Sequence, residues 1–294
     1  MMNGFLVLNK PEGVTSFKAA SSFRRIFSEK KIGHTGTLDP MATGVLPVAL
    51  GKATRFIDCL PDCGKAYRAR FRLGTVTDTL DITGTVLRRC ETSAGYDEIK
   101  EVLPFFTGEI EQLPPMYSAV SVNGVRLYKL ARQGIEVERE KRLVTVSSVE
   151  LADLGDGEFR LDVSCSKGTY IRTIIADIGE KLGCGAVMTA LCRTASDGFT
   201  MDMAHTPEEA EALGEKAVMK IDEVFSFCPE ISVTAGQTVR FSNGGELSAD
   251  RLNTELSAGF YRVYSPEKKF LGLGEVKAED VSVLKAKKVM GNDI

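Results

Sequence analysis

The segment from Gly33 to Gly44 combines residue types that can do covalent chemistry on a ligand. Asp39 is followed by Pro40, which disfavours helical geometry at the residue before it, so the carboxylate is predicted on extended backbone. The glycines of this segment let a ligand approach the main chain closely. Such a loop can present one ionised carboxylate to a ring as a nucleophile. An isolated Asp-Pro pair is also typical of a turn in which the carboxylate only accepts hydrogen bonds from nearby amides.

A second candidate is Arg172, which lies at the start of an apolar helical stripe formed by Ile171, Ile174, Ile175, Ile178 and Leu182. A cation in the first turn of a helix opposes the macrodipole at a cost of roughly 0.3–1 kcal/mol. We therefore expect Arg172 to have an anionic partner, either a phosphate or a carboxylate such as Asp39. A solvated surface arginine is the alternative interpretation.

The segment from Tyr67 to Leu73 alternates between apolar and basic residues, which predicts a half-buried strand with a basic outer face. That outer face consists of Arg68, Arg70 and Arg72. Tyr67 belongs to the apolar face, where a lone tyrosine is more typical of a core than of a catalytic site. His34 could stack on a base or finish a turn, and Lys10 could fix the entry to a site or mark a strand end.

Other elements are predicted from apolar periodicity. Phe5 to Leu8 is suited to a buried strand, and Ser16 is predicted to cap a helix. The apolar face of that helix would contain Phe17, Ala20, Phe23 and Phe27. Asn123-Gly124 predicts a hairpin turn, although a helix could equally begin near Leu127.

A chain of 294 residues exceeds one typical domain. After Pro229 the sequence changes to short strands interrupted by glycine, which favours a small β barrel. We therefore expect a larger domain over residues 1–230 and a smaller one over residues 231–294.

The formal net charge of -3 hides an uneven distribution. Residues 1–72 contain 12 basic and 5 acidic residues, and residues 120–145 contain 6 and 3. Phosphate contacts need a locally positive face and not a positive total, so a nucleic-acid partner is compatible with the composition. Ordinary solvated charge is compatible with it as well.

Other classes of protein are disfavoured. No apolar run approaches the roughly 18–20 residues that a membrane helix needs, and residues 1–10 do not resemble a signal peptide. Seven scattered cysteines and two histidines offer neither a disulfide framework nor a metal site. A soluble, cytoplasmic protein without metal is the expectation.

Several segments together resemble one family, the TruB-type tRNA pseudouridine-55 synthases. They occur in the family's order with similar spacing over about residues 5–195, which makes the combination specific. The matching segments are Leu8 to Pro11, Gly33 to Gly44, Lys65 to Arg68, Pro114 to Val120, Arg126 to Tyr128 and Cys165 to Arg172.

The resemblance implies an α+β fold with a mixed, mainly antiparallel sheet and flanking helices, and a C-terminal PUA-like barrel. It implies an RNA-gripping insertion at about residues 115–143, where Ser121 and Val125 replace residues that are often basic in relatives. It gives Asp39, Tyr67 and Arg172 the catalytic positions. The positions that would bind substrate or RNA are His34, Lys10, Tyr170, Leu191, Arg68, Arg126 and Arg132.

The implied reaction is isomerisation of uridine to pseudouridine at position 55 in the T loop of tRNA, with base flipping and without a cofactor. The expected partner is the T-arm stem-loop, bound by a monomer without an obligatory protein partner. Two alternatives keep the fold: a guide-dependent synthase of the dyskerin type, and a non-catalytic tRNA-binding or folding protein. A hydrolase that uses Asp78 and Asp81 is a third, weaker one, since their loop predicts no apolar pocket.

Overall fold

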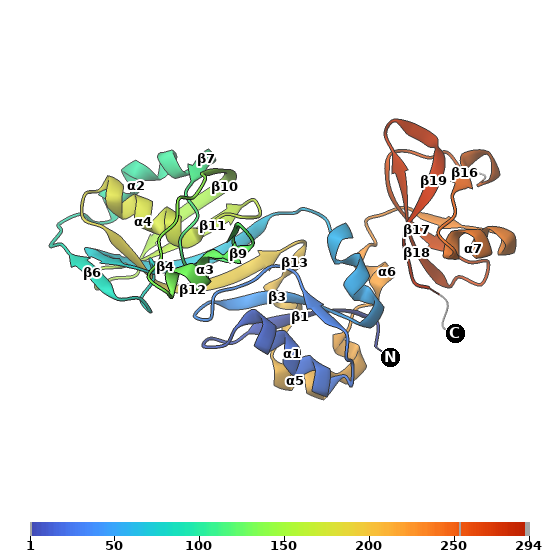
Figure 1. Cartoon of the computed structure of the whole chain (residues 1–294), viewed down its shortest axis with the longest axis horizontal. Helices are drawn as coiled ribbons and strands as arrows, with labels where there is room; N and C mark the ends of the chain where they lie inside the picture. Colours follow the sequence, from blue (N-terminus) through green and yellow to red (C-terminus); the bar gives the residue numbers. More distant parts are fainter. Residues whose placement is uncertain (1, 253, 292–294) are drawn as a thin grey trace.

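The computed structural model describes residues 2–252 and 254–291, which form an elongated molecule with two sheets at opposite ends (Figure 1). The larger sheet has ten strands in the order β14-β1-β3-β12-β4-β11-β10-β7, with β13 paired to β12 and β2 paired to β3. Its pairs are antiparallel except β1–β14 and β3–β12. Together with the flanking helices this gives a mixed, mainly antiparallel α+β fold, which confirms the expected fold class.

The bounds of these elements follow the chain. The strands of the large sheet are β1 (Gly4–Lys10), β2 (Ile32–His34), β3 (Thr43–Leu50), β4 (Lys65–Leu73), β7 (Gly108–Gln112), β10 (Arg142–Asp153), β11 (Glu158–Cys165), β12 (Ala186–Ser196), β13 (Phe199–Thr200) and β14 (Ala204–His205). The α-helices are α1 (Ser16–Ile26), α2 (Tyr96–Val102), α3 (Leu127–Ala131), α4 (Ile171–Lys181), α5 (Pro207–Leu213), α6 (Ile221–Val224) and α7 (Ala235–Ser242). A separate pair joins β5 (Thr75–Thr77) and β6 (Val86–Arg89).

Strand β4 has the two faces that its alternating sequence predicts. Ala69 and Phe71 are buried in a core that also contains the isoleucines of α4, and Tyr67 packs against the same core. The three arginines of β4 are exposed on the opposite face. The sheet therefore separates an apolar side, covered by α4, from a charged side that faces solvent.

The start of α1 differs from the prediction. Thr15 is the N-cap, and its hydroxyl accepts a hydrogen bond from the Lys18 amide at 3.2 Å. Ser16 lies inside the helix and is buried, with its hydroxyl turned toward another segment. Phe17 is 64% exposed, so its predicted place on the buried face is wrong; that face instead contains Ala19, Ala20 and Phe23.

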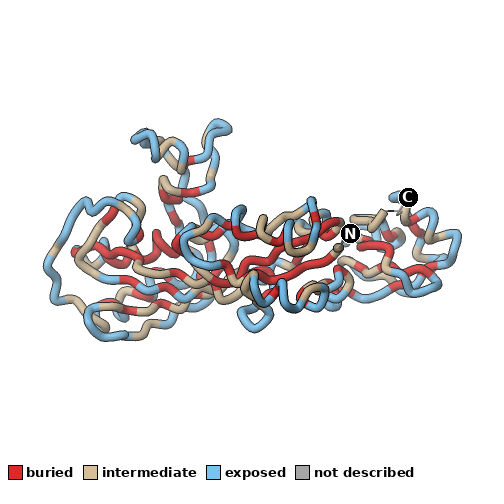
Figure 2. The backbone as a smooth tube through the Cα atoms, turned by 90° about the horizontal axis from the view of Figure 1, so that it is seen from below, coloured by how far each residue is buried: buried red, intermediate tan, exposed pale blue. Residues whose placement is uncertain are grey.

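An arm projects from the sheet between β7 and β10 (Figure 2). It contains β8 (Ser121–Val122) and β9 (Val125–Arg126), which pair with each other and lead directly into α3. Asn123 and Gly124 form the turn with φ of 50° and 77°. The hairpin and the helix that the sequence offered as alternatives are therefore both present.

The C-terminal sheet has five strands in the order β15-β17-β18-β19-β16. Their bounds are β15 (Glu230–Ser232), β16 (Leu247–Ser248), β17 (Gly259–Tyr264), β18 (Phe270–Lys277) and β19 (Asp280–Val289). This sheet contacts the larger domain through Tyr264, whose hydroxyl donates to Asp222 at 3.1 Å, and through Phe270, whose ring lies 6.2 Å from that of Phe56. Among the described residues, no helix combines the length and apolar character that spanning a membrane requires.

Candidate active site

The loop that carries Asp39 is held from α1 by a buried serine. The Ser16 hydroxyl accepts a hydrogen bond from the Leu38 amide at 2.8 Å and donates one to the Leu38 carbonyl at 3.1 Å. Leu38 itself is buried in the core beneath α4. The residue before Asp39 is thus fixed by both of its backbone polar groups and by its side chain, which restricts where the carboxylate can lie.

Lys10 holds the other side of the same loop. Its ammonium donates to the carbonyl of Ala42 at 2.6 Å, of Pro11 at 2.8 Å and of Pro40 at 3.2 Å. The Lys10 side chain is fully buried, and burial lowers its pKa to about 8. The expected RNA contact is therefore corrected: all three ammonium protons are used inside the protein, and Lys10 supports the Asp39 loop.

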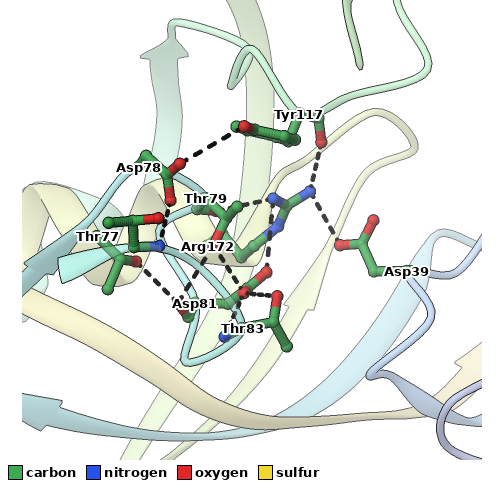
Figure 3. Close-up of polar contacts among 9 residues, drawn as sticks. Asp39, Thr77, Asp78, Thr79, Asp81, Thr83, Tyr117 and Arg172 are labelled. Carbon is green, nitrogen blue, oxygen red and sulfur yellow. Dashed lines mark hydrogen bonds and ion pairs between the residues drawn. The ribbon is translucent and has the colours of Figure 1, made fainter. Parts of the chain in front are cut away.

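The predicted partnership between Arg172 and Asp39 is present (Figure 3). Nη2 of Arg172 lies 2.9 Å from Oδ2 of Asp39, and the same nitrogen donates to the Tyr117 carbonyl at 2.8 Å. Nη1 donates to the Thr79 carbonyl at 2.8 Å. The guanidinium is buried, whereas 36% of the Asp39 side chain remains exposed. A fixed cation is thereby aimed at a carboxylate that a ligand can still reach.

A second carboxylate lies behind the guanidinium. Oδ2 of Asp81 is 3.7 Å from Nη1 of Arg172, and Asp81 is only 4% exposed. Its Oδ1 accepts hydrogen bonds from the Thr79 hydroxyl, the Thr83 amide and the Thr83 hydroxyl at 2.8, 2.9 and 2.6 Å. Asp81 is thus fixed within its own turn, and its charge compensates that of Arg172.

The pKa of Asp39 is raised above its ordinary value of 3.8, although Arg172 lies beside it. Burial is the largest cause, and the negative charge of Asp81 acts in the same direction. The guanidinium of Arg172 opposes both effects and favours the ionised form. Since the carboxylate stays partly exposed and ion-paired, we expect it to be ionised at neutral pH.

Two neighbouring strands carry the residues that the resemblance places around the uracil. Tyr67 of β4 and Leu191 of β12 both belong to the core beneath α4. Burial raises the pKa of Tyr67 to about 12, although the nearby guanidinium of Arg193 lowers it. At neutral pH Tyr67 therefore presents a neutral phenol ring to the pocket.

The two remaining expected pocket residues lie at the ends of elements. His34 ends β2, and its Nδ1 is buried without a hydrogen-bond partner among the described residues. Burial lowers the pKa of His34, so its ring is neutral at neutral pH. Tyr170 is the N-cap of α4, and Gln112 bonds both its amide and its carbonyl at 2.9 and 3.2 Å.

The basic residues expected to grip RNA occupy different surfaces. Arg68 lies on the charged face of the sheet, away from α4, and its Nε is 2.7 Å from Oδ1 of Asp162. Its expected part in binding RNA stays a prediction, and the ion pair with Asp162 reduces the positive charge that it offers to a phosphate. Arg126 and Arg132 lie on the arm, where Arg126 donates to the Ala119 carbonyl and Arg132 lies over the Tyr128 ring at 5.4 Å.

Sequence reasoning missed two charged residues of this region. Asp81 was considered only as half of a hydrolase pair, although a buried aspartate between two threonines could have indicated a structural anion. Arg193 follows Leu191 on β12 and is fully buried, which no sequence pattern announced. In the described part of the chain, no group of three or more histidine, cysteine, aspartate or glutamate side chains is arranged to hold a metal ion.

A partly exposed carboxylate on a held loop, paired with a buried arginine on an α+β sheet, is the arrangement that the resemblance implies for the pseudouridine synthase class. Family models agree. Residues 24–171 match the TruB family pseudouridylate synthase N-terminal domain, residues 172–224 the tRNA pseudouridylate synthase B C-terminal domain, and residues 229–290 the pseudouridine synthase II TruB C-terminal domain.

Similar proteins cover nearly the whole chain. The tRNA pseudouridine synthase B of Alkaliphilus oremlandii is 44% identical over 95% of this chain and 95% of its own length. That of Clostridium perfringens is 46% identical over 93% of this chain and 95% of its own length. The chain belongs to the TruB family of pseudouridylate synthases and is an isomerase of that class.

Solved structures show the same fold. A crystal structure of a Cbf5-Nop10-Gar1 complex contains a chain that is 26% identical, with a TM-score of 0.74 over 99% of this chain and 86% of that chain. A chain in a crystal structure of the archaeal box H/ACA sRNP Nop10-Cbf5 complex is 25% identical, with a TM-score of 0.70. The match covers 99% of this chain and 87% of that chain.

Two adjacent hydroxyls allow the support of the Asp39 loop to be tested. Ser16→Ala leaves the buried Leu38 amide without its partner and should cost about 1–3 kcal/mol of unfolding free energy. It should also slow pseudouridine formation, because Asp39 follows Leu38. Thr15→Ala removes only the N-cap of α1 and should cost about 1 kcal/mol. Denaturant unfolding and single-turnover rates measure both effects; an equal loss of rate in the two variants would contradict the assignment.

Proposed function

We propose that this enzyme converts uridine to pseudouridine at position 55 in the T loop of tRNA, with Asp39 as the nucleophile. The observation that carries the proposal is the partly exposed Asp39 carboxylate, which lies 2.9 Å from a buried arginine and near enough to Tyr67 to raise the pKa of its phenol. The choice of tRNA rests on relatives of 44–46% identity that are named tRNA pseudouridine synthase B.

The reaction breaks the bond between ribose C1' and uracil N1, rotates the base and joins C1' to C5. One proton leaves C5 and one is added at N1, so there is no net oxidation or hydrolysis and no cofactor is needed. The ionised carboxylate of Asp39 attacks either C6 of the base or C1' of the ribose, and both fit a single nucleophile on a rigid loop. The bond to Asp39 breaks again once C1' is joined to C5, which regenerates the carboxylate. The detached base stays in the pocket until it has rotated.

Arg172 orients the nucleophile and keeps it ionised. Its guanidinium is held by the Thr79 and Tyr117 carbonyls and by the charge of Asp81, so it cannot follow Asp39 out of the pocket. A nucleophile held in one orientation does not lose orientational freedom when it attacks. The fixed positive charge also favours the ionised form that attack requires.

Tyr67 takes the role of a stacking platform for the flipped uracil. Its ring belongs to the apolar side of β4, on the same side as Leu191 of the neighbouring strand. A tyrosine with a pKa of about 12 is almost wholly protonated at neutral pH, so stacking is its first role. Tyr67 can accept the C5 proton only as a phenolate, which requires a neighbouring group that favours this ionised form.

The arm brings RNA to this pocket. Its first residues contact the site directly, since the Tyr117 carbonyl accepts a hydrogen bond from Arg172. Arg126 and Arg132 lie farther along the arm and offer positive charge for the backbone of the T loop. Flipping the target base costs a few kcal/mol, which phosphate contacts and stacking on Tyr67 offset.

A guide-dependent synthase is the second candidate, favoured by the similarity to Cbf5 in complexes with other proteins. The identity to those chains is 25–26%, against 44–46% to the tRNA pseudouridine synthase B relatives. Purified protein and unmodified tRNA, without guide RNA, distinguish the two. Turnover at position 55 under these conditions excludes dependence on a guide.

Replacing the proposed nucleophile gives the most direct test. Asp39→Asn removes the attacking oxygen charge and should lower the single-turnover rate by about 10⁴-fold or more, as for nucleophile removal elsewhere. Mass spectrometry of the T-loop fragment measures the product. Asp156→Asn, in the exposed turn between β10 and β11, is a matched control and should retain the normal rate. Normal turnover by Asp39→Asn would refute the mechanism.

The raised pKa of Asp39 predicts the acid side of the pH–rate profile. Because the ionised form attacks, kcat/KM should fall as pH drops through that pKa, which lies above the usual 3.8. Asp81→Asn removes a negative charge that raises the pKa of Asp39, so the acid limb should move to lower pH. Asp78→Asn, in the same turn, is the control and should leave the limb in place. A limb that moves upward in Asp81→Asn would contradict the electrostatic model.

The arm and the charged face of the sheet make opposite predictions for RNA affinity. Arg126→Glu or Arg132→Glu should raise the Kd for tRNA and reduce the slope of log K against log salt by about 0.7–0.9 per lost phosphate contact. Arg68→Glu, on the face opposite Asp39, should change neither. Filter binding across salt concentrations measures both quantities. If Arg68→Glu weakens tRNA binding while the arm variants bind normally, the RNA lies on the other face of the sheet.

A further inference from the structure

Arg193 is the largest fully buried side chain of the described residues, and the proposed mechanism does not yet use it. Its Nε donates to the Val45 carbonyl of β3 at 2.7 Å, which fixes the direction of the guanidinium. Nη1 and Nη2 have no hydrogen-bond partner among the described residues. No described carboxylate lies within 4 Å of the group, so a full positive charge is buried without an ion pair. Burying such a charge costs free energy unless an anionic group compensates it.

The position of Arg193 points to Tyr67. In the β4–β12 pairing (Figure 1), Arg193 is the direct cross-strand partner of Tyr67, as Leu191 is of Ala69. Directly opposed residues of antiparallel strands share one face of the sheet, so the guanidinium and the phenol lie side by side on the pocket side. Nη1 also lies 3.6 Å from the point that a Cβ on Gly36 would occupy, so it reaches the loop that carries Asp39.

Arg193 acts on the charge state of several neighbours, of which Tyr67 is its direct cross-strand partner. The charged and titratable groups around the pair are Lys10, His34, Asp39, Lys65, Cys165 and Asp197. Lys65 is a second cation, whose pKa is lowered chiefly by burial and then by Arg193. Tyr67 and Arg193 each alter the pKa of the other in the direction that favours a phenolate beside a guanidinium.

We infer that Arg193 is a positioning residue for this reaction, whose fixed positive charge favours the negatively charged form of Tyr67 when the C5 proton leaves. The inference rests on the proposed function. Once C1' is bonded to C5, the Tyr67 phenolate takes the C5 proton and the C–H electron pair returns to the ring. N1 takes a proton from water, and the phenol returns its proton to solvent, so the balance is closed.

A double-mutant cycle tests whether Arg193 acts through the hydroxyl. Arg193→Met should lower the single-turnover rate by about tenfold or more, since each unit added to the Tyr67 pKa removes about nine-tenths of the phenolate. Arg193→Lys keeps a cation and should recover part of the loss. In a Tyr67→Phe background, Arg193→Met should cost little more, because its target is absent. Additive losses would overturn the inference.

A kinetic isotope effect provides a readout that a merely structural role would not move. With tRNA that carries deuterium at C5 of the target uridine, Arg193→Met should show a larger isotope effect than the unaltered enzyme, because C5 deprotonation becomes slower. An unchanged isotope effect would overturn the inference even if the rate falls. Arg160→Met, on β11 and facing away from the pocket, is the control and should match the unaltered enzyme.

Two further results keep the possible failures apart. Circular dichroism and the thermal midpoint should show Arg193→Met folded, because a buried cation with two unpaired nitrogens is replaced by an apolar side chain of similar length. If the unaltered enzyme forms no pseudouridine, the proposed function fails. If it is active and the cycle is additive, only the role of Arg193 fails.

Discussion

The bond between Arg172 and Asp39 is the interaction on which the rest of the site depends. It joins a helix start to a loop more than 130 positions earlier in the chain, and each partner is also held by other groups. Arg172 is fixed by the carbonyls of Thr79 and Tyr117, and Asp39 is fixed through the hydrogen bonds that Ser16 and Lys10 make with its loop. The ion pair is therefore the meeting point of two rigid supports, which allows a carboxylate to stay reachable and still be oriented.

Charge balance explains why so many polar residues surround this pair. A buried guanidinium is costly when its one carboxylate partner is partly exposed, because its charge is then incompletely compensated. Asp81 supplies a second negative charge behind it. The same charge raises the pKa of Asp39, so the support of Arg172 works against the ionisation of the nucleophile. Asp81 thus helps to hold Arg172 in place but makes Asp39 less acidic. The partial exposure of Asp39 to solvent favours its ionised form.

The sheet has an apolar face covered by α4 and a charged face toward solvent. Arg68 and Arg72 face carboxylates of β11 across the solvent side, so much of the positive charge of β4 is neutralised within the protein. The arm carries Arg126 and Arg132, and its base contacts Arg172 through the Tyr117 carbonyl. The arm and the orientation of Asp39 therefore share one hydrogen-bonded connection.

The α+β class was predicted from the resemblance to a family, whereas local pattern was enough to predict the half-buried β4, the loop character around Asp39 and the need of Arg172 for an anion. The three local predictions rest on rules about neighbouring residues. Each of these follows from short-range rules: alternation in strands, the effect of Pro40 on Asp39, and the unfavourable dipole at a helix start. Tertiary structure alone decided which residues meet. It turned Ser16 from a presumed helix cap into the anchor of Leu38, buried Lys10 beneath the loop and placed Arg68 on the far face. It also made Asp81 and Arg193 part of the site, because burial and cross-strand register depend on contacts between segments distant in sequence, which no local pattern records.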